Sequence, residues 1–344
     1  MTPDDVLGVP RAWADMWWSA LGIDDVPPPA QTPRDEFALP AGAVLYHFLG
    51  TRRAKTPLLL VPSLINRWYV LDLRPGASLV EALVGAGFDV WCLDWGEPDA
   101  EDRYLGWDEV LARLARAVRR VKRETGAASV GLLGYCMGGT LSAIHAALYP
   151  EQVAALIDLA GPIDFAQGGM LRRMVDRRWF DADAIADAGN VAPPQMQAGF
   201  VALRPTLDLA KIMSWPDLVG DPDARTAYLV LDAWASDNIP FPGEAYRRYI
   251  GDLYQNNELV AGRHRVAGRA VALGAITCPT LVITASRDQI CPALAATALL
   301  AHVGSRDRKV IEVPGGHVGA VVGRRAAQQM YPALVEWLAP RLGC

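Results

Sequence analysis

The chain has few cysteines, and no two of them are spaced as a metal-binding or redox pair. The five cysteines are Cys92, Cys136, Cys278, Cys291 and Cys344 in 344 residues. An odd number without a C-x-x-C pair argues against a disulfide framework and against a zinc site, and it suits a reducing compartment. We therefore expect no bound metal.

The sequence also lacks a long apolar run. No stretch reaches the length of about 18 apolar residues that a membrane-spanning helix needs. The N-terminal "MTPDDVLGVPRAWADMWW" is acidic where a secretory signal would be basic. We expect a cytoplasmic protein without a transmembrane segment. With a net charge of −5 and scattered basic residues, a nucleic-acid partner is not indicated.

Strand and helix patterns alternate along most of the chain. This alternation predicts a mostly parallel sheet with helices on both faces. The short apolar run "TPLLLVPS" (56–63) is typical of a strand that is buried on both faces. Further strands are predicted at 88–96, 129–136, 153–161, 278–288 and 308–316, and helices at 78–87, 107–126, 137–150, near 292–303 and at 324–340.

One irregular stretch interrupts this alternation. Residues 165–270 are rich in Trp, Pro, Arg and Asp, with helical pieces and no clear parallel strands. We predict an inserted helical cap over the carboxyl ends of the strands, where open α/β sheets place their sites. Residues 41–164 and 271–344 then form the core, and residues 1–40 are an N-terminal segment with a Pro-rich connector.

The string "GYCMG" (134–138) follows a predicted strand and precedes a predicted helix. This arrangement is typical of a nucleophile elbow, a sharp turn whose strained backbone needs small neighbouring residues. The nucleophile position is Cys136, with Gly134 and Gly138 two residues to either side. The alternative is an inert cysteine that packs in the core.

An elbow nucleophile needs an acid and a histidine, in that order along the chain. His317 lies in the turn "GGHVGA" after the last predicted strand, where the base belongs. Asp288 follows the preceding strand and is the expected acid, with Asp94 as its rival. The other histidines are less well placed: His47 before the sheet, His145 in the helix after the elbow, His264 in the insertion and His302 at a helix end.

Two backbone N–H groups should form an oxyanion hole. Met137, directly after the nucleophile, supplies one of them. The loop "SLINRW" (63–68) supplies the other from Leu64 or Ile65.

A thiol nucleophile indicates the type of substrate. Free thiols are mostly protonated at neutral pH, but a neighbouring histidine and a helix N-terminus favour the thiolate. A thiolate that attacks a thioester makes a nearly isoenergetic exchange, and the acyl group stays activated for an alcohol acceptor. Cys136 therefore suits acyl transfer from a thioester better than ester hydrolysis.

Several blocks of the sequence resemble the catalytic subunit of the polyhydroxyalkanoate synthases, in particular the short two-subunit type. "GYCMGGTLSA" is similar to the lipase-box variant with cysteine in that family. "SRDQICP" and "GGHVGAVVG" are similar to its acid and histidine motifs, and "PSLINRWYVLDLRPGASLVEALVGAGFDVWCLDWGEP" to its oxyanion-loop block. Further blocks lie in the cap, and the resemblance runs from about residue 40 to 340.

The resemblance implies an α/β-hydrolase fold and polymerisation of (R)-3-hydroxyacyl-CoA into polyester. Cys136 would carry the growing chain, His317 would act as base, and Asp288 would orient His317. No cofactor is expected, because the CoA thioester is the substrate. The resemblance also implies a second synthase subunit, a homodimer, and work at the surface of polyester granules. The family commonly has histidine where this chain has Gln289.

Two other functions remain open. One is a cysteine-nucleophile hydrolase, a thioesterase or esterase, with water as the acceptor. The other is a non-catalytic granule-associated protein, against which the order Cys136, Asp288, His317 argues. Cys291 is most simply a turn residue, with a second redox-active thiol as the alternative.

Overall fold

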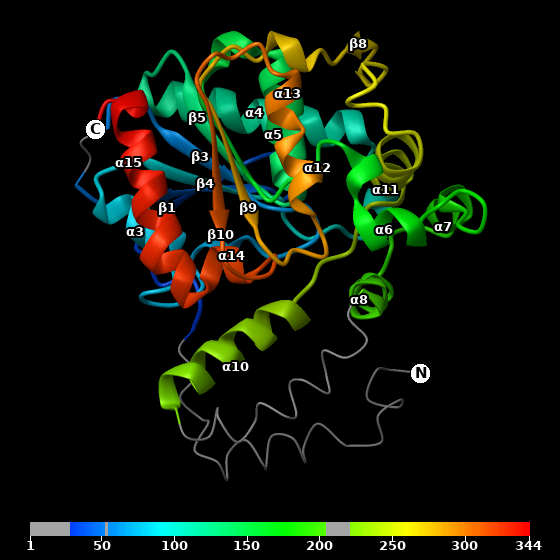
Figure 1. The fold of residues 1–344 in the computed structure, drawn as a ribbon, viewed down its shortest axis with the longest axis horizontal. Coiled ribbons are helices and arrows are strands. Elements are labelled where there is room, and N and C mark those ends of the chain that lie inside the picture. Colours follow the sequence, from blue (N-terminus) through cyan, green and yellow to red (C-terminus); the bar gives the residue numbers. More distant parts are fainter. Residues whose placement is uncertain (1–27, 52–53, 204–220) are drawn as a thin grey trace.

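An eight-stranded sheet forms the centre of the computed structural model, which describes residues 28–51, 54–203 and 221–344 (Figure 1). The strands are β1 (Arg34–Ala38), β2 (Val44–Phe48), β3 (Leu58–Val61), β4 (Val90–Asp94), β5 (Val130–Tyr135), β6 (Val153–Leu159), β9 (Thr280–Ala285) and β10 (Arg308–Val313). They lie in the order β1-β2-β4-β3-β5-β6-β9-β10. β2 pairs antiparallel with β1 and β4, and the remaining pairs are parallel. The predicted mostly parallel sheet is confirmed.

Helices cover both faces of this sheet. α3 (Leu79–Gly85) and α15 (Tyr331–Leu342) pack on one face, and α4 (Trp107–Thr125), α5 (Met137–Leu148) and α12 (Ala293–Thr297) pack on the other (Figure 1). The shorter helical elements of the core are α13 (Leu299–His302), α14 (Gly319–Val322), η1 (Trp68–Leu71), η2 (Glu101–Tyr104), η3 (Pro150–Gln152), η6 (Leu273–Ala275) and the π-helix η7 (Ala326–Met330).

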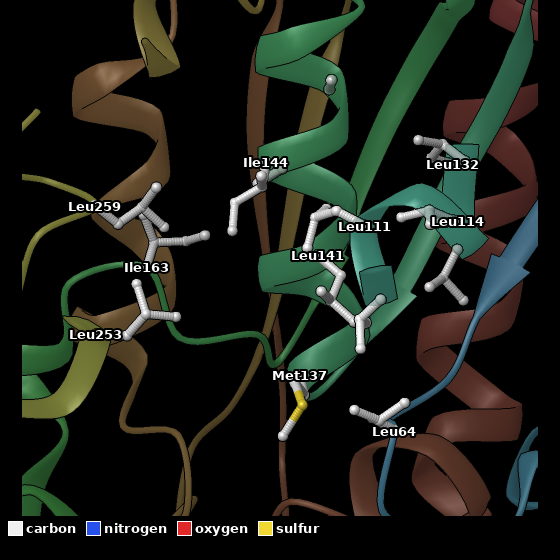
Figure 2. Close-up of a cluster of buried hydrophobic side chains, with 14 of the residues drawn as sticks. Leu64, Leu111, Leu114, Leu132, Met137, Leu141, Ile144, Ile163, Leu253 and Leu259 are labelled. Carbon is white, nitrogen blue, oxygen red and sulfur yellow. The ribbon is translucent and has the colours of Figure 1, made fainter. Parts of the chain in front are cut away.

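The side chains of β3 alternate between two hydrophobic clusters. Leu58 and Leu60 point to the cluster under α3 and α15, whereas Leu59 and Val61 point to the cluster under α4 and α5. Side chains of a strand alternate between the two faces of the sheet. Because both faces are buried here, every position of β3 is apolar and the sequence shows one continuous apolar run. Figure 2 shows part of the cluster under α4 and α5. Packing in this cluster fixes the position of α5 and therefore the position of its first residue, Met137.

Helical elements fill the chain between β6 and β9. They are η4 (Phe165–Gln167), α6 (Gly169–Met174), α7 (Ala182–Asp187), α8 (Pro193–Ala202), α10 (Pro222–Ser236), α11 (Gly243–Arg248) and the π-helix η5 (Tyr249–Gln255), followed by the short pair β7 (Arg265–Val266) and β8 (Arg269–Ala270). Figure 1 shows α6, α7, α8 and α11 together at the right of the view. The predicted limits of the insertion, 165–270, stay a prediction.

The N-terminal part of the described chain differs from the sequence prediction. Residues 34–38, predicted as connector, form the edge strand β1, and residues 1–27 lie outside the described residues. His47 does not precede the sheet but lies within β2, where its Nε2 is 2.9 Å from Asp89 Oδ1. Such five-residue antiparallel strands carry little local signal, because their pairing partners are distant in sequence.

No helix among the described residues combines the length and the apolar composition that crossing a membrane requires. The longest helix named above, α4, is amphipathic. Its first turn carries Asp108 and Glu109, and its last turn carries Lys122 and Arg123. This distribution matches the helix dipole, and Gly126 ends the helix in the left-handed conformation at φ +71°, as the sequence predicted.

His145 makes the folded state sensitive to acid. The side chain is fully buried on α5, and its ring nitrogens have no hydrogen-bond partner within the described structure. Burial, assisted by the charges of Arg119 and Lys122, lowers the pKa of His145 to about 3. The unfolded chain takes up this proton near pH 6.5 and the folded chain does not, so the free energy of unfolding falls as the pH drops through this window.

Replacing His145 by leucine is therefore expected to flatten the acid dependence of stability by up to about 1.4 kcal/mol per pH unit. Urea unfolding between about pH 7 and 4 measures this slope. The exposed His302 on α13 is the matched control, and His302→Leu should leave the slope as in the wild type. An unchanged slope in His145→Leu would contradict the assignment.

Candidate active site

Cys136 lies in the sharp turn between β5 and α5. Its backbone has φ +56° and ψ −127°, a conformation that residues other than glycine rarely adopt. The thiol is partly exposed. This is the strained strand-turn-helix geometry of a nucleophile elbow, and it places the sulfur at the N-terminus of α5.

The glycines of the elbow allow α5 to approach the sheet. A Cβ atom on Gly138 would overlap the carbonyl oxygen of Val61 and lie 2.8 Å from that of Pro62. A Cβ atom on Gly134 would overlap the carbonyl of Gly138. The start of α5 is therefore pressed against the end of β3, which brings the loop after β3 to the elbow.

Gly138→Ala is expected to lower the free energy of unfolding by at least about 3 kcal/mol, because backbone atoms must move to admit the methyl group. Urea unfolding measures the loss. Gly85→Ala in α3 is the matched control, since a Cβ atom there meets nothing within 4 Å. It should be neutral or stabilising by up to about 1 kcal/mol. Equal stabilities of the two variants would refute the packing argument.

Asp288 and His317 form a buried pair. Asp288 follows β9, and its Oδ1 accepts hydrogen bonds from the backbone N–H groups of Ile290 (2.8 Å) and Cys291 (2.9 Å). Its Oδ2 is 2.7 Å from Nδ1 of His317, which lies after β10. The carboxylate is thus held by its own turn, and it orients the imidazole ring with Nδ1 as donor.

The second ring nitrogen of His317, Nε2, is buried and has no hydrogen-bond partner among the described residues. The ring interacts electrostatically with Cys136. Burial lowers the pKa of His317, but the charge of Cys136, the hydrogen bond with Asp288 and the charge of Asp288 outweigh it and raise the pKa to about 10. The protonated form of the histidine is therefore favoured at neutral pH.

Tyr135, for which the sequence predicted no role, holds the histidine in place. Its ring stacks on that of His317, with centroids 5.2 Å apart and an interplanar angle of 29°. Tyr135 is the residue directly before Cys136 in the elbow, so its position in the motif was a usable signal. The stacking itself joins two distant parts of the chain, so the sequence carries no local signal for it.

The rival acid, Asp94, has other partners. It accepts hydrogen bonds from the Tyr46 hydroxyl (3.3 Å) and from the backbone N–H of Gly96 (3.0 Å) at the end of β4. Gln289 is exposed in the turn after Asp288. The structure therefore brings together Cys136, Asp288 and His317 and leaves Asp94 apart from them.

A cavity of about 550 Å³ opens beside Cys136. Met137 and Ile65 lie in its wall on the sheet side. The insertion supplies most of the remaining wall, and the side chains there are predominantly apolar. They include Leu171, Met174, Val175, Trp179, Phe180, Ile185, Val191, Met196, Phe200, Phe241 and Ile250. A pocket of this kind fits an acyl chain better than a charged ligand.

The expected oxyanion-hole residues lie close to this cavity. Met137 and Ile65 line it together with Cys136, whereas the side chain of Leu64 is buried in the core cluster that also contains Met137 (Figure 2). Their backbone N–H groups as oxyanion donors stay a prediction.

One group of potential metal ligands comes together among the described residues: Asp252, Glu258 and His264. The Trp107 indole donates to Nε2 of His264 at 3.1 Å, so the neutral ring carries its proton on Nδ1 and has no free lone pair. Arg248 already pairs with Asp252 at 2.7 Å. The chemistry of this cluster does not fit a metal ion.

A family model described as the alpha/beta hydrolase fold matches residues 56–323. Among solved structures, the monoglyceride lipase of Saccharomyces cerevisiae has a TM-score of 0.56 at 13% identity, over 91% of this chain and 97% of that one. Est1E of Butyrivibrio proteoclasticus has a TM-score of 0.54 at 14% identity, over 90% and 99%. At this identity the structures show the fold alone.

Curated relatives carry the name poly(3-hydroxyalkanoate) polymerase subunit PhaC. The protein of Allochromatium vinosum is 35% identical over 83% of this chain and 81% of its own length. The protein of Synechocystis is 32% identical over 90% and 85%. The protein of Haloferax mediterranei is 36% identical, and the chain spans 59% of its length. The chain has the α/β-hydrolase fold and belongs to the family of poly(3-hydroxyalkanoate) polymerase PhaC subunits.

Proposed function

We propose that this protein is the catalytic subunit of a polyhydroxyalkanoate synthase, an acyltransferase that polymerises (R)-3-hydroxyacyl-CoA. One observation carries the proposal: in a chain of the PhaC family, a cysteine at a strained elbow faces a buried histidine–aspartate pair and opens on an apolar cavity of about 550 Å³. Cys136, Asp288 and His317 are the catalytic residues, and no cofactor is needed.

The first step loads Cys136. Its thiolate attacks the thioester carbonyl of (R)-3-hydroxyacyl-CoA, and the backbone N–H groups of Met137 and of Leu64 or Ile65 stabilise the oxyanion. The carbon–sulfur bond to CoA breaks, and the leaving thiolate takes the proton of His317. Asp288 keeps Nδ1 of the ring protonated, so that Nε2 gives and takes the mobile proton.

The second step extends the polyester. The 3-hydroxyl of another acyl group gives its proton to His317, and its oxygen attacks the thioester carbonyl on Cys136. An ester forms and the Cys136 thiolate leaves. The apolar wall of the cavity disfavours water as the acceptor, which supports ester formation over hydrolysis.

The surroundings of the enzyme belong to the same proposal. The relatives are named as subunits, which supports a second synthase subunit as partner of this chain. We further infer a homodimer that works in the cytoplasm at the surface of polyester granules, as the family resemblance implies.

The test is incubation with (R)-3-hydroxybutyryl-CoA, with and without a second synthase subunit, while CoA thiol release and turbidity are followed together. The proposal expects both signals to rise. Thiol release with soluble 3-hydroxy acid and no turbidity would identify a hydrolase instead. Absence of both signals under both conditions would indicate a non-catalytic protein.

A further inference from the structure

Two tyrosines of the insertion line the same cavity as Cys136. Tyr249 and Tyr254 both belong to the π-helix η5 (Tyr249–Gln255), which lies between α11 and the β7–β8 pair. Residues five apart diverge by about 140° around an α-helix. The wider π turn, seen in the hydrogen bond from Asn256 N–H to the Gly251 carbonyl (3.0 Å), brings their rings together at 5.5 Å between centroids. Single π turns of this kind often occur at functional sites.

Aromatic neighbours fix the two rings. Tyr249 packs on Trp107 at 5.5 Å and on Phe241 at 5.9 Å, and Tyr254 packs edge-on against Phe165 at 4.7 Å between centroids. Both tyrosines are buried, with exposed fractions of 7% and 2%. Their hydroxyls are therefore pre-positioned polar groups in a wall that is otherwise mostly apolar.

The two phenol rings lie 5.5 Å apart between centroids, and both hydroxyls are neutral. Burial raises the pKa of both. Each phenol therefore keeps a proton that it can donate to an acceptor in the cavity. Both phenols also interact electrostatically with Cys136.

Other polar groups of the cavity wall are less suited to bind an acyl oxygen near the sulfur. The Gln195 side chain accepts a hydrogen bond from the Ala192 backbone N–H. The Cys291 thiol is a weak donor. Tyr246 lines the cavity too, but it belongs to α11 rather than to the π turn, and its ring packs edge-on against Phe241 at 5.5 Å between centroids.

We propose that the hydroxyls of the Tyr249–Tyr254 pair bind the 3-oxygen of the acyl group on Cys136. In such a thioester the 3-oxygen lies two carbons beyond the carbonyl carbon, on the cavity side of the sulfur. It accepts a hydrogen bond both as a free hydroxyl and as the ester oxygen of a growing chain. A buried donor left unpaired is costly, so the pair selects 3-oxygenated acyl groups over plain ones. This inference rests on the proposed acyl transfer at Cys136.

The test compares (R)-3-hydroxybutyryl-CoA with butyryl-CoA, which lacks only the 3-hydroxyl. In single-turnover CoA release, Tyr254→Phe should lower kcat/KM for the hydroxylated thioester by about 10- to 100-fold and leave butyryl-CoA nearly unchanged. Tyr249→Phe should show the same loss of selectivity. Tyr246→Phe is the matched control and should keep the wild-type ratio. Thermal unfolding verifies that each variant is folded.

A second measurement does not depend on turnover. In a Cys136→Ala background, which cannot be acylated, calorimetry should show tighter binding of the hydroxylated thioester, and Tyr254→Phe should abolish that preference. An unchanged ratio, or an equal loss for both thioesters, would overturn the role of the tyrosine pair. A binding preference without any CoA release from the wild type would keep that role and overturn the acyl transfer instead.

Discussion

Replacing Cys136 by alanine is expected to lower CoA release from (R)-3-hydroxybutyryl-CoA by about 10⁴-fold or more. The reason is that a nucleophile acts as a unit with its base, and His317 alone has no group to activate. The fold should persist, because alanine retains the Cβ atom and the sulfur is partly exposed. The measurement is thiol release under saturating substrate, with thermal unfolding as the check on folding.

Cys278→Ala is the matched control for this experiment. Cys278 precedes β9, is half-buried, and is not among the residues that line the cavity. Its alanine variant should release CoA at the wild-type rate. If Cys136→Ala retained that rate too, the sulfur at the elbow would not be the acyl carrier.

Asp288→Asn is expected to lower CoA release by about 10²- to 10⁴-fold. An asparagine amide can present a donor to Nδ1, which favours the wrong tautomer of His317. The substitution also removes a negative charge and a hydrogen bond that raise the pKa of His317. The pKa of the ring should therefore fall, and its protonated form should be lost at a lower pH than in the wild type.

Histidine NMR titration of the two proteins measures this shift, and thiol release measures the activity. Asp94→Asn is the control, since Asp94 bonds Tyr46 and Gly96 and not the histidine. Its CoA release should stay within a few-fold of the wild type. A larger loss in Asp94→Asn than in Asp288→Asn would reverse the assignment of the acid.

The sequence predicted those parts of the fold and site that depend on local pattern. The run that contains Leu58–Val61 is apolar because both faces of β3 are buried, and the glycines around Cys136 are required by the close approach of α5. The order of nucleophile, acid and histidine then placed Asp288 and His317 at the ends of successive strands. The observed contact of 2.7 Å between these two residues agrees with that placement.

The parts that the sequence did not predict depend on contacts distant along the chain. β1 and β2 are stabilised by pairing at the edge of the sheet, not by a pattern of their own. The stacking of Tyr135 on His317 joins residues 182 positions apart. The π turn that brings Tyr249 and Tyr254 together has no hydrophobic period by which a sequence could signal it.

The volume of the cavity limits how much product the enzyme can store. A 3-hydroxybutyrate repeat has six non-hydrogen atoms, so a cavity of about 550 Å³ holds only a short stretch of polyester. Under the proposed reaction, each repeat that is added after the cavity is full must push an equal length of polyester out of the cavity. Elongation by this protein is therefore also extrusion, in which bond formation at Cys136 drives the movement of the polymer.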